Sequence, residues 1–331
     1  MQSEKYSRDN AGQSLKKYIL LKKGELAYNH GASKAKQYGC CYELTENEAR
    51  IPYVYHCFKI SGTEHTPYVA TALNNPKIDR QLKRLVSSSV RMDGLLNISF
   101  DDYMSVILHL PSLKEQTHIA DFLKKLDERI TSQEKLVASL KKYKRGAVTH
   151  ILSGKSTAFA VTSSWTEQTL SELCSEFRSG RNISATLIHQ NGNYPVYGGN
   201  GIRGYCNQYS HDGEYVVVGR QGALCGNVRL IQGKNYLSEH AIAVQANEAN
   251  ETKFLLYLLD YMKLGQYSDQ GAQPGLAVNK LLRLKCMVPD KQTQIKIASF
   301  LMSFDFQIST QERMLMLLNN QRRALLQQLF I

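Results

Sequence analysis

Glycine-rich stretches are the first places to look for catalytic chemistry, because backbone amides in such turns can hold phosphate groups. Gly199-Asn200-Gly201-Ile202-Arg203-Gly204 has the Gly-x-Gly-x-x-Gly spacing of a dinucleotide-binding turn. That turn requires a helix directly behind it, and the following residues, 205–210, predict none. Gly154-Lys155-Ser156 resembles the end of a phosphate-binding loop, but Thr149 stands where its first glycine is required. Neither stretch predicts a nucleotide site.

Other catalytic motifs are missing from the sequence. There is no Asn-Pro-Pro-Tyr or Asp-Pro-Pro-Tyr motif of the kind that amino-methyltransferases use. The 9 histidines include no His-Glu-x-x-His pair and the 7 cysteines no Cys-x-x-Cys pair, so we expect reduced thiols, no metal site and no catalytic residue. His240 is expected to be a strand or turn residue. What remains is binding chemistry.

The charge of the chain favours a polyanionic partner, since 41 Lys and Arg outnumber 29 Asp and Glu. Two loops, 198–205 and 219–222, mix Arg, Gln, Asn and Gly, which are types that reach base edges or let a backbone come close. For any single residue, the alternative of a tight β-turn with a solvated tip is favoured. The DNA-binding candidates are Asn200, Arg203, Arg220 and Gln221, with weaker ones at Lys22, Lys23, Asn29, His30 and Lys34.

An internal repeat organises the elements that must position these residues. Residues 111–152 align without a gap on residues 289–330, at an offset of 178 and with 12 identities in 42 positions. The shared pattern is Gln-x-x-Ile-Ala-x-Phe-Leu, which begins at Gln116 and at Gln294, followed by Asp, Ile and Gln-Glu. Apolar residues recur in alternating steps of four and three, which predicts two long helices.

The 3.5-residue average spacing is typical of a coiled coil, so the two helices are expected to pack against each other. A helix of roughly 35 residues is about 50 Å long, which is more than one turn of duplex DNA at about 34 Å. Such a pair could separate two DNA-reading domains. A helical hairpin that only dimerises the protein is an equally good reading of the repeat alone.

The predicted architecture is α+β, with two globular domains that alternate with two long helices. The expected segments are 1–110 for the first globular domain, 111–152 for the first helix, 153–164 for a linker, 165–288 for the second globular domain and 289–331 for the second helix. Residues 215–219 and 241–244 predict strands, and residues 252–263 a helix. The run from Tyr18 to Leu26 parallels residues 215–224, so the first domain is expected to lack about 33 residues of its leading part.

The repeated Gln-x-x-Ile-Ala-x-Phe-Leu pattern, together with the run from Tyr194 to Tyr205, resembles the specificity subunits of type I restriction-modification systems. The resemblance covers nearly the whole chain. It implies two target-recognition domains, each reading half of a bipartite site in double-stranded DNA. It also implies that the long helices pack antiparallel and set the gap between the half-sites.

The resemblance further implies that two methyltransferase subunits dock on the helices and that restriction subunits join the complex. S-adenosylmethionine, ATP and magnesium would then act on those partners, and this chain would hold no cofactor. The rival functions are a self-contained DNA methyltransferase or nuclease, and a coiled-coil assembly protein without a DNA role. Because no apolar run reaches the roughly 18 residues of a membrane span, we expect a cytoplasmic protein without membrane contact.

Overall fold

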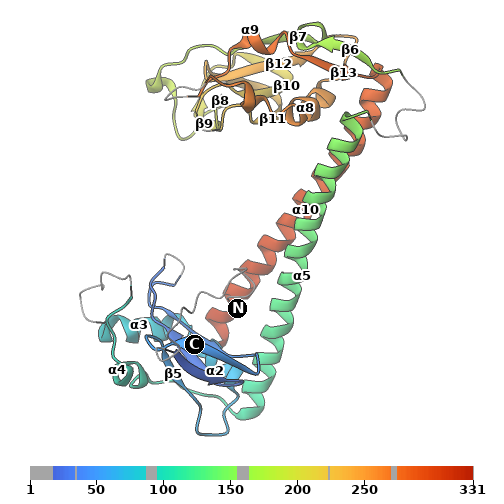
Figure 1. Ribbon diagram of the computed structural model, residues 1–331. Helices are drawn as coiled ribbons and strands as arrows, with labels where there is room; N and C mark the ends of the chain where they lie inside the picture. Colours follow the sequence, from blue (N-terminus) through green and yellow to red (C-terminus); the bar gives the residue numbers. More distant parts are fainter. Residues whose placement is uncertain are drawn as a thin grey trace. The chain divides into compact units, whose positions relative to one another are not determined.

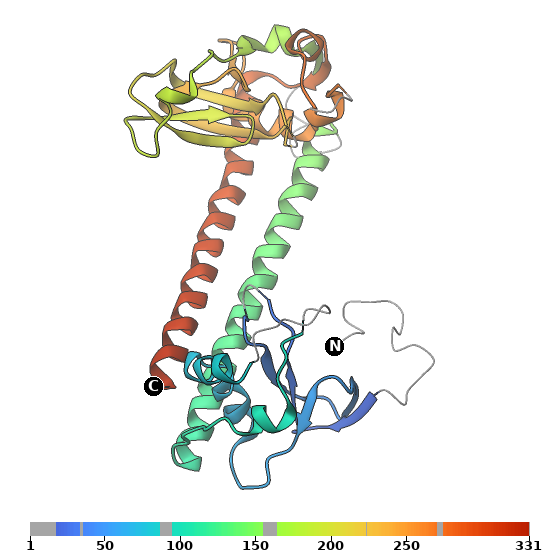
Figure 2. The ribbon, with the colours of Figure 1, turned by 90° about the vertical axis from the view of Figure 1, so that its left-hand side faces the viewer.

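The computed structural model, drawn in Figures 1 and 2, describes residues 18–33, 36–86, 95–154, 164–222, 224–269 and 274–330. The chain divides into two compact units. Unit 1 comprises Met1–Glu134 and Arg313–Ile331, and unit 2 comprises Lys135–Glu312. In the described part of the chain, no helix is both long and apolar enough to cross a membrane.

Both predicted long helices are present, as α5 (Leu113–Leu152) and α10 (Lys291–Leu329). Each begins two residues later than the repeat boundary because a polar residue caps it. The Ser112 hydroxyl accepts the Glu115 amide at 3.4 Å while the Glu115 carboxylate accepts the Ser112 amide at 3.0 Å. At the start of α10, the Asp290 carboxylate accepts the Thr293 amide at 3.0 Å. Each cap satisfies amides that the first helical turn leaves unpaired.

Unit 2 is built on a six-stranded sheet in the order β7-β12-β10-β11-β8-β9. Neighbouring strands are antiparallel except β11 and β8, which are parallel. The elements are β6 (Thr166–Thr169), α7 (Leu170–Leu173), β7 (Cys174–Ser179), a 3₁₀ turn (Ala185–Leu187), β8 (Tyr194–Gly198), β9 (Gly201–Cys206), β10 (His211–Gly219), β11 (Val228–Leu237), β12 (Ala241–Ala246), α8 (Thr252–Tyr261), a second 3₁₀ turn (Leu264–Tyr267), α9 (Val278–Leu281) and β13 (Lys285–Val288). Strands β13 and β6 form a separate antiparallel pair.

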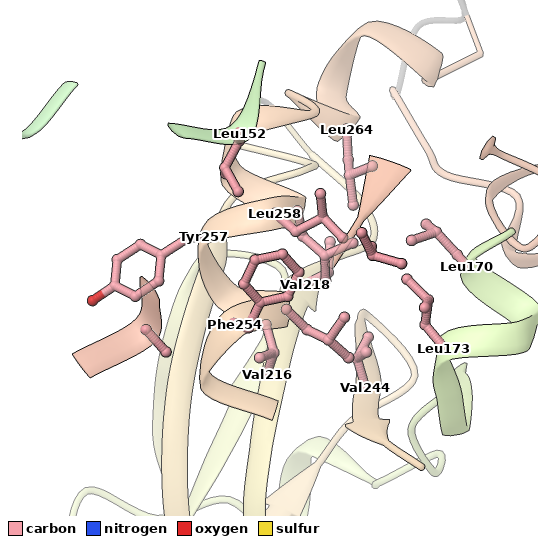
Figure 3. Close-up of a cluster of buried hydrophobic side chains, with 14 of the residues drawn as sticks. Leu152, Leu170, Leu173, Val216, Val218, Val244, Phe254, Tyr257, Leu258 and Leu264 are labelled. Atoms are coloured by element: carbon pink, nitrogen blue, oxygen red, sulfur yellow. The ribbon is translucent and has the colours of Figure 1, made fainter. Parts of the chain in front are cut away.

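The core of unit 2 explains the apolar run in β10, because both faces of this strand are covered. Val216 and Val218 point toward α8 and pack with Phe254 and Leu258, as Figure 3 shows. The alternate residues of the strand pack on the opposite face with Ile231 of β11. A strand buried on both sides reads as a continuous hydrophobic stretch, which is why the sequence predicted it.

Unit 1 contains a smaller version of the same sheet. Its elements are β1 (Tyr18–Lys22), β2 (Leu26–Asn29), β3 (Cys40–Glu43), β4 (Glu48–Pro52), β5 (His56–Phe58), α2 (Thr66–Ala72), α3 (Pro76–Leu85) and α4 (Phe100–Met104). The order β3-β2-β5, with β2 antiparallel to both neighbours, repeats the order β11-β10-β12 of unit 2. A helix then follows in each unit, α2 or α8.

This topology corrects the sequence alignment of Tyr18–Leu26 with the β10 segment. Strand β2, not β1, occupies the central place that β10 has in unit 2, while β1 pairs with β4 alone among the described strands. Ile19 and Leu20 of β1 are exposed, so the apolar run there does not mark a core strand. In the described part of unit 1, no strand takes the places that β7, β8 and β9 have in unit 2.

The repeated glutamines make the same connection in both units. The Gln116 side-chain oxygen accepts the backbone N–H of His65, just before α2, at 2.9 Å, and its amide donates to the Pro111 carbonyl at 2.9 Å. Gln294 accepts the N–H of Glu251, just before α8, at 3.0 Å, and donates to the Pro289 carbonyl at 2.9 Å. The glutamine thus joins the start of each long helix to the globular part of its unit.

The two long helices also contact each other within each unit, at equivalent positions of the repeat. In unit 1, Arg322 of α10 makes a two-point ion pair with Asp127 of α5. In unit 2, Lys144 of α5 pairs with Asp305 of α10 at 2.5 Å. Arg322 and Lys144 are separated by the same offset of 178 as the two aspartates. Leu126, Ile130 and Leu318 form the apolar part of the contact in unit 1.

Candidate nucleic-acid interface

Close backbone contacts bring the two predicted loops of unit 2 together. A Cβ added to Gly199, in the turn between β8 and β9, would lie 2.4 Å from the carbonyl oxygen of Gln221. A Cβ added to Gly219, at the end of β10, would lie 2.2 Å from the carbonyl oxygen of Gly199. Only glycine permits this approach, and it places the β8–β9 turn directly beside the loop that follows β10.

Asn200 and Arg203 are exposed on this loop cluster. Asn200 lies at the tip of the β8–β9 turn, and Arg203 follows in β9. The aliphatic part of Arg203 lies over Gly198, where an added Cβ would be 2.4 Å from the Arg203 Cδ. Both side chains are polar and exposed, so they are accessible to a ligand. Close contacts at its glycines hold the hairpin that carries them. Their role in DNA binding stays a prediction.

Arg220 and Gln221 have protein partners instead. The Arg220 guanidinium donates to the carbonyl oxygens of Leu276 at 3.4 Å and Glu239 at 3.3 Å. The Gln221 side-chain oxygen accepts a hydrogen bond from the His240 ring at 2.5 Å. The bonds with Glu239 and His240 hold the loop after β10 to the β11–β12 turn. Arg220 and Gln221 therefore position the loops of this end of unit 2. His240 is a turn residue, as the sequence predicted.

Three further polar residues lie at the same end of unit 2, and sequence reasoning missed them. Asn227, Arg229 and Asp260 are exposed and line a hollow together with Tyr197 and the β8–β9 turn. Arg229 lies within β11 and Asp260 near the end of α8, so neither is in a loop. Loop position therefore does not predict them, and the one available signal is Arg229 between the apolar residues Val228 and Leu230.

The candidates in unit 1 have different environments. His30 is 4% exposed, and its ring nitrogens lie 3.0 Å from the Leu96 carbonyl oxygen and 2.5 Å from that of Val54. It stacks on the ring of His56 at 5.0 Å. A buried ring between two carbonyls cannot reach DNA, so the prediction for His30 is wrong. The sequence offered no sign that Val54 and Leu96, which are distant in the chain, would enclose it.

The other DNA-binding candidates of unit 1 are Asn29, Lys22, Lys23 and Lys34. The Asn29 side-chain oxygen accepts the Gly31 amide at 2.9 Å, which uses it in a local turn. Lys22 and Lys23 are exposed at the end of β1 and stay predictions. Lys34 lies outside the described residues.

A partly buried hydrogen-bonded network in unit 2 joins three strands. The Ser210 hydroxyl lies 2.7 Å from the His211 ring and accepts the Leu237 amide at 2.9 Å, while the other ring nitrogen of His211 lies 3.1 Å from the Glu176 carboxylate. Burial lowers the pKa of His211. The network connects β7 to β10 and β11. In the described residues, no group of three or more His, Cys, Asp or Glu side chains is arranged to hold a metal ion.

Comparisons with known proteins find similarity to specificity subunits of type I restriction enzymes. Residues 162–318 match the family model described as the type I restriction modification DNA specificity domain. The type I restriction enzyme EcoprrI specificity subunit of Escherichia coli is 46% identical over 142 residues, which cover 42% of this chain. A putative type I restriction enzyme specificity subunit of Haemophilus influenzae is 26% identical over 135 residues. Each match spans 35% of the relative's own length.

Solved structures share the fold over nearly the whole chain. The S subunit of a type I restriction-modification system from M. genitalium superposes with a TM-score of 0.65 at 19% identity, covering 98% of this chain and 86% of that one. A chain from a study of complex assembly and conformational transition of a type I R-M system has a TM-score of 0.57 at 15% identity, covering 96% of this chain and 84% of that one. The sequence match thus covers the second half of the chain, residues 162–318, and the chain as a whole shares the fold of these solved S subunits.

Proposed function

We propose that this chain is a noncatalytic subunit that recognises a DNA sequence. The observation that carries the proposal is the exposed polar cluster of Asn200, Arg203 and Arg229, because it lies within the 162–318 segment that matches a DNA specificity domain. Arginine and asparagine side chains form the two-point hydrogen bonds that distinguish guanine and adenine in the major groove. The net charge of +12 favours approach to a polyanion.

Unit 2 is the principal reader in this proposal. Unit 1 shares the central strands and the following helix but, in its described residues, has no counterpart of the β8–β9 turn. We therefore infer that its contribution to sequence recognition is impaired or is complemented by another chain. Lys22 and Lys23 are its remaining candidate contacts, with phosphate groups as the natural ligand of exposed lysines.

In the proposal, the long helices form an antiparallel coiled coil that fixes the gap between two half-sites. The equivalent ion pairs, Asp127 with Arg322 and Asp305 with Lys144, support this arrangement because each unit contributes the same contact in reversed roles. Two methyltransferase subunits would dock on the helices, and restriction subunits would complete the complex. S-adenosylmethionine, ATP and magnesium would act on those partners, and this chain would hold none of them.

The test is selection of bound duplexes from a random library with the full chain, copurified with its methyltransferase subunit. A split motif with a fixed gap is expected if both units read DNA, and a single half-site or its palindrome if unit 2 alone does. Absence of any enriched motif would refute sequence recognition. In parallel, the purified chain alone should not bind the methyl donor, and binding would favour a self-contained methyltransferase.

A further inference from the structure

The hollow beside the β8–β9 turn has a composition that points to a specific ligand. It is open to solvent and is lined by residues 198–201 together with Tyr197, Asn227, Arg229 and Asp260. The hollow thus combines a cation and an anion at one end of the sheet of unit 2. Any ligand must satisfy both charges.

The Arg229 guanidinium is placed by the glycine opposite it. Gly201 has a φ of +96°, which favours glycine, and a Cβ there would lie only 2.7 Å from Arg229 Nη1. The missing side chain therefore lets the guanidinium lie against the hairpin turn. Arg229 is exposed in β11, where it pairs with Val217 of β10. Within the described residues, its side chain has no hydrogen-bonded or ion-paired acceptor. Its planar set of donors remains available.

Asp260 decides between two kinds of ligand for these donors. This exposed residue lines the same hollow, and in the described part of the chain its carboxylate has no ion pair within 4.0 Å, with Arg229 or any other cation. A phosphate group in the hollow would be repelled by this carboxylate. A base pair that presents acceptors beside a donor would satisfy both side chains. In the major groove, a G·C pair does so, with guanine N7 and O6 next to the cytosine N4 amino group.

We propose that this hollow binds the major-groove edge of one G·C base pair, with Arg229 donating to guanine and Asp260 accepting from cytosine. The inference rests on the proposed function, since it assumes that unit 2 reads DNA. It adds a base-pair identity and two residues outside the loops, both on regular elements. Contacts made from a strand and a helix are held more rigidly than contacts from a loop tip.

The experiment compares the full chain with Arg229→Ala, Arg229→Lys and Asp260→Asn. Each protein is used to select duplexes from the random library, and its affinity for the selected site and for each single-base variant is measured at several salt concentrations. Arg283→Ala is the matched control, because Arg283 is exposed in unit 2, is not among the residues that line the hollow, and its loss removes the same charge. Unfolding followed by Trp165 fluorescence verifies that unit 2 of every variant is folded.

The unaltered chain is expected to require G·C at one position of its site. Arg229→Ala should reduce the preference at that position by about tenfold or more, and lysine should not restore it because it lacks the two-point donor geometry. Asp260→Asn should relax the same position. Arg283→Ala should leave all preferences unchanged.

Several results would overturn the inference. If Arg229→Ala weakens all sequences alike and lowers the salt dependence by about one phosphate contact, Arg229 binds the backbone. If Arg229 and Asp260 affect different positions, or none, they do not read one base pair. Failure of the proposed function itself looks different, because the unaltered chain would then enrich no motif at all.

Discussion

Replacing Gln294 with alanine is expected to destabilise unit 2 by about 2 to 4 kcal/mol, because three hydrogen bonds of a buried amide are lost at once. The side chain is 1% exposed. Its oxygen accepts the Glu251 amide at 3.0 Å, and its NH₂ group donates to the Asn250 side chain at 2.7 Å and to the Pro289 carbonyl at 2.9 Å. In the alanine variant, the Glu251 amide, the Asn250 side chain and the Pro289 carbonyl lose these hydrogen bonds in a buried place that water does not reach freely.

The estimate follows from the energetics of single hydrogen bonds. Each contributes roughly 0.5 to 1.5 kcal/mol net, and a buried group left unpaired costs roughly 1 to 3 kcal/mol. Gln294→Glu separates the two sides of the amide, since it keeps the acceptor for Glu251 but places a carboxylate oxygen against the Asn250 and Pro289 oxygens. It should therefore be destabilising at neutral pH as well, and less so in acid, where the carboxyl group can be protonated and donate.

Trp165 makes the measurement specific to unit 2. It is the one tryptophan of the sequence and packs partly buried against the core of this unit, so its fluorescence follows the unfolding of unit 2. Urea unfolding of the full chain, with the midpoint shift multiplied by the denaturant slope, gives the change in free energy. Gln292→Ala is the control, because it removes the same side chain from an exposed position two residues away.

The control is expected to stay within about 0.5 kcal/mol of the unaltered protein. A loss below about 1 kcal/mol for Gln294→Ala would refute the reasoning, since the three bonds would then be replaceable by water. Gln116→Ala is the equivalent change in unit 1, where the amide makes two such bonds. We expect it to leave the Trp165 transition less affected than Gln294→Ala does.

The other predictions concern glycine and two buried titratable groups of unit 2. Gly226→Ala should cost about 1 to 3 kcal/mol more than Gly233→Ala in the Trp165 transition. Both glycines have positive φ, but a Cβ at Gly226 would lie 2.2 Å from the Gly265 nitrogen and one at Gly233 meets open space; equal losses would contradict the steric argument. Burial lowers the pKa of His211, so the unfolded chain takes up the proton first and unit 2 should lose stability as the pH falls below about 6.5. His211→Asn should flatten that slope in urea unfolding at pH 5 to 7, and an unchanged slope would assign the loss to other groups. Burial, followed by the neighbouring carboxylate, raises the pKa of Tyr257, so stability should fall as the pH rises above about 10, where the unfolded tyrosine ionises. Tyr257→Phe should reduce the alkaline slope, and a slope as steep as before would exclude this tyrosine as its cause.

The sequence by itself determined the elements whose signals are local or repeated. Apolar spacing over some forty residues predicted both long helices, because a helix of that length needs a continuous stripe. The apolar run of β10 predicted a buried strand because both of its faces are covered. The 178-residue offset identified Gln116 and Gln294 as equivalent before any contact was known. It did not say what they bind, because their partners, His65 and Glu251, lie far away in the chain.

Tertiary structure decided which polar side chains remain available to a ligand. His30, Arg220 and Gln221 have the same residue types as DNA-reading side chains, yet carbonyls and a histidine from distant segments use their donors and acceptors. Arg229 and Asp260 lie on a strand and a helix, and only the packing of β11 and α8 around the β8–β9 turn brings them to one hollow. Residue type and spacing report what a side chain can bond to. Whether it is already bonded depends on segments that only folding brings near.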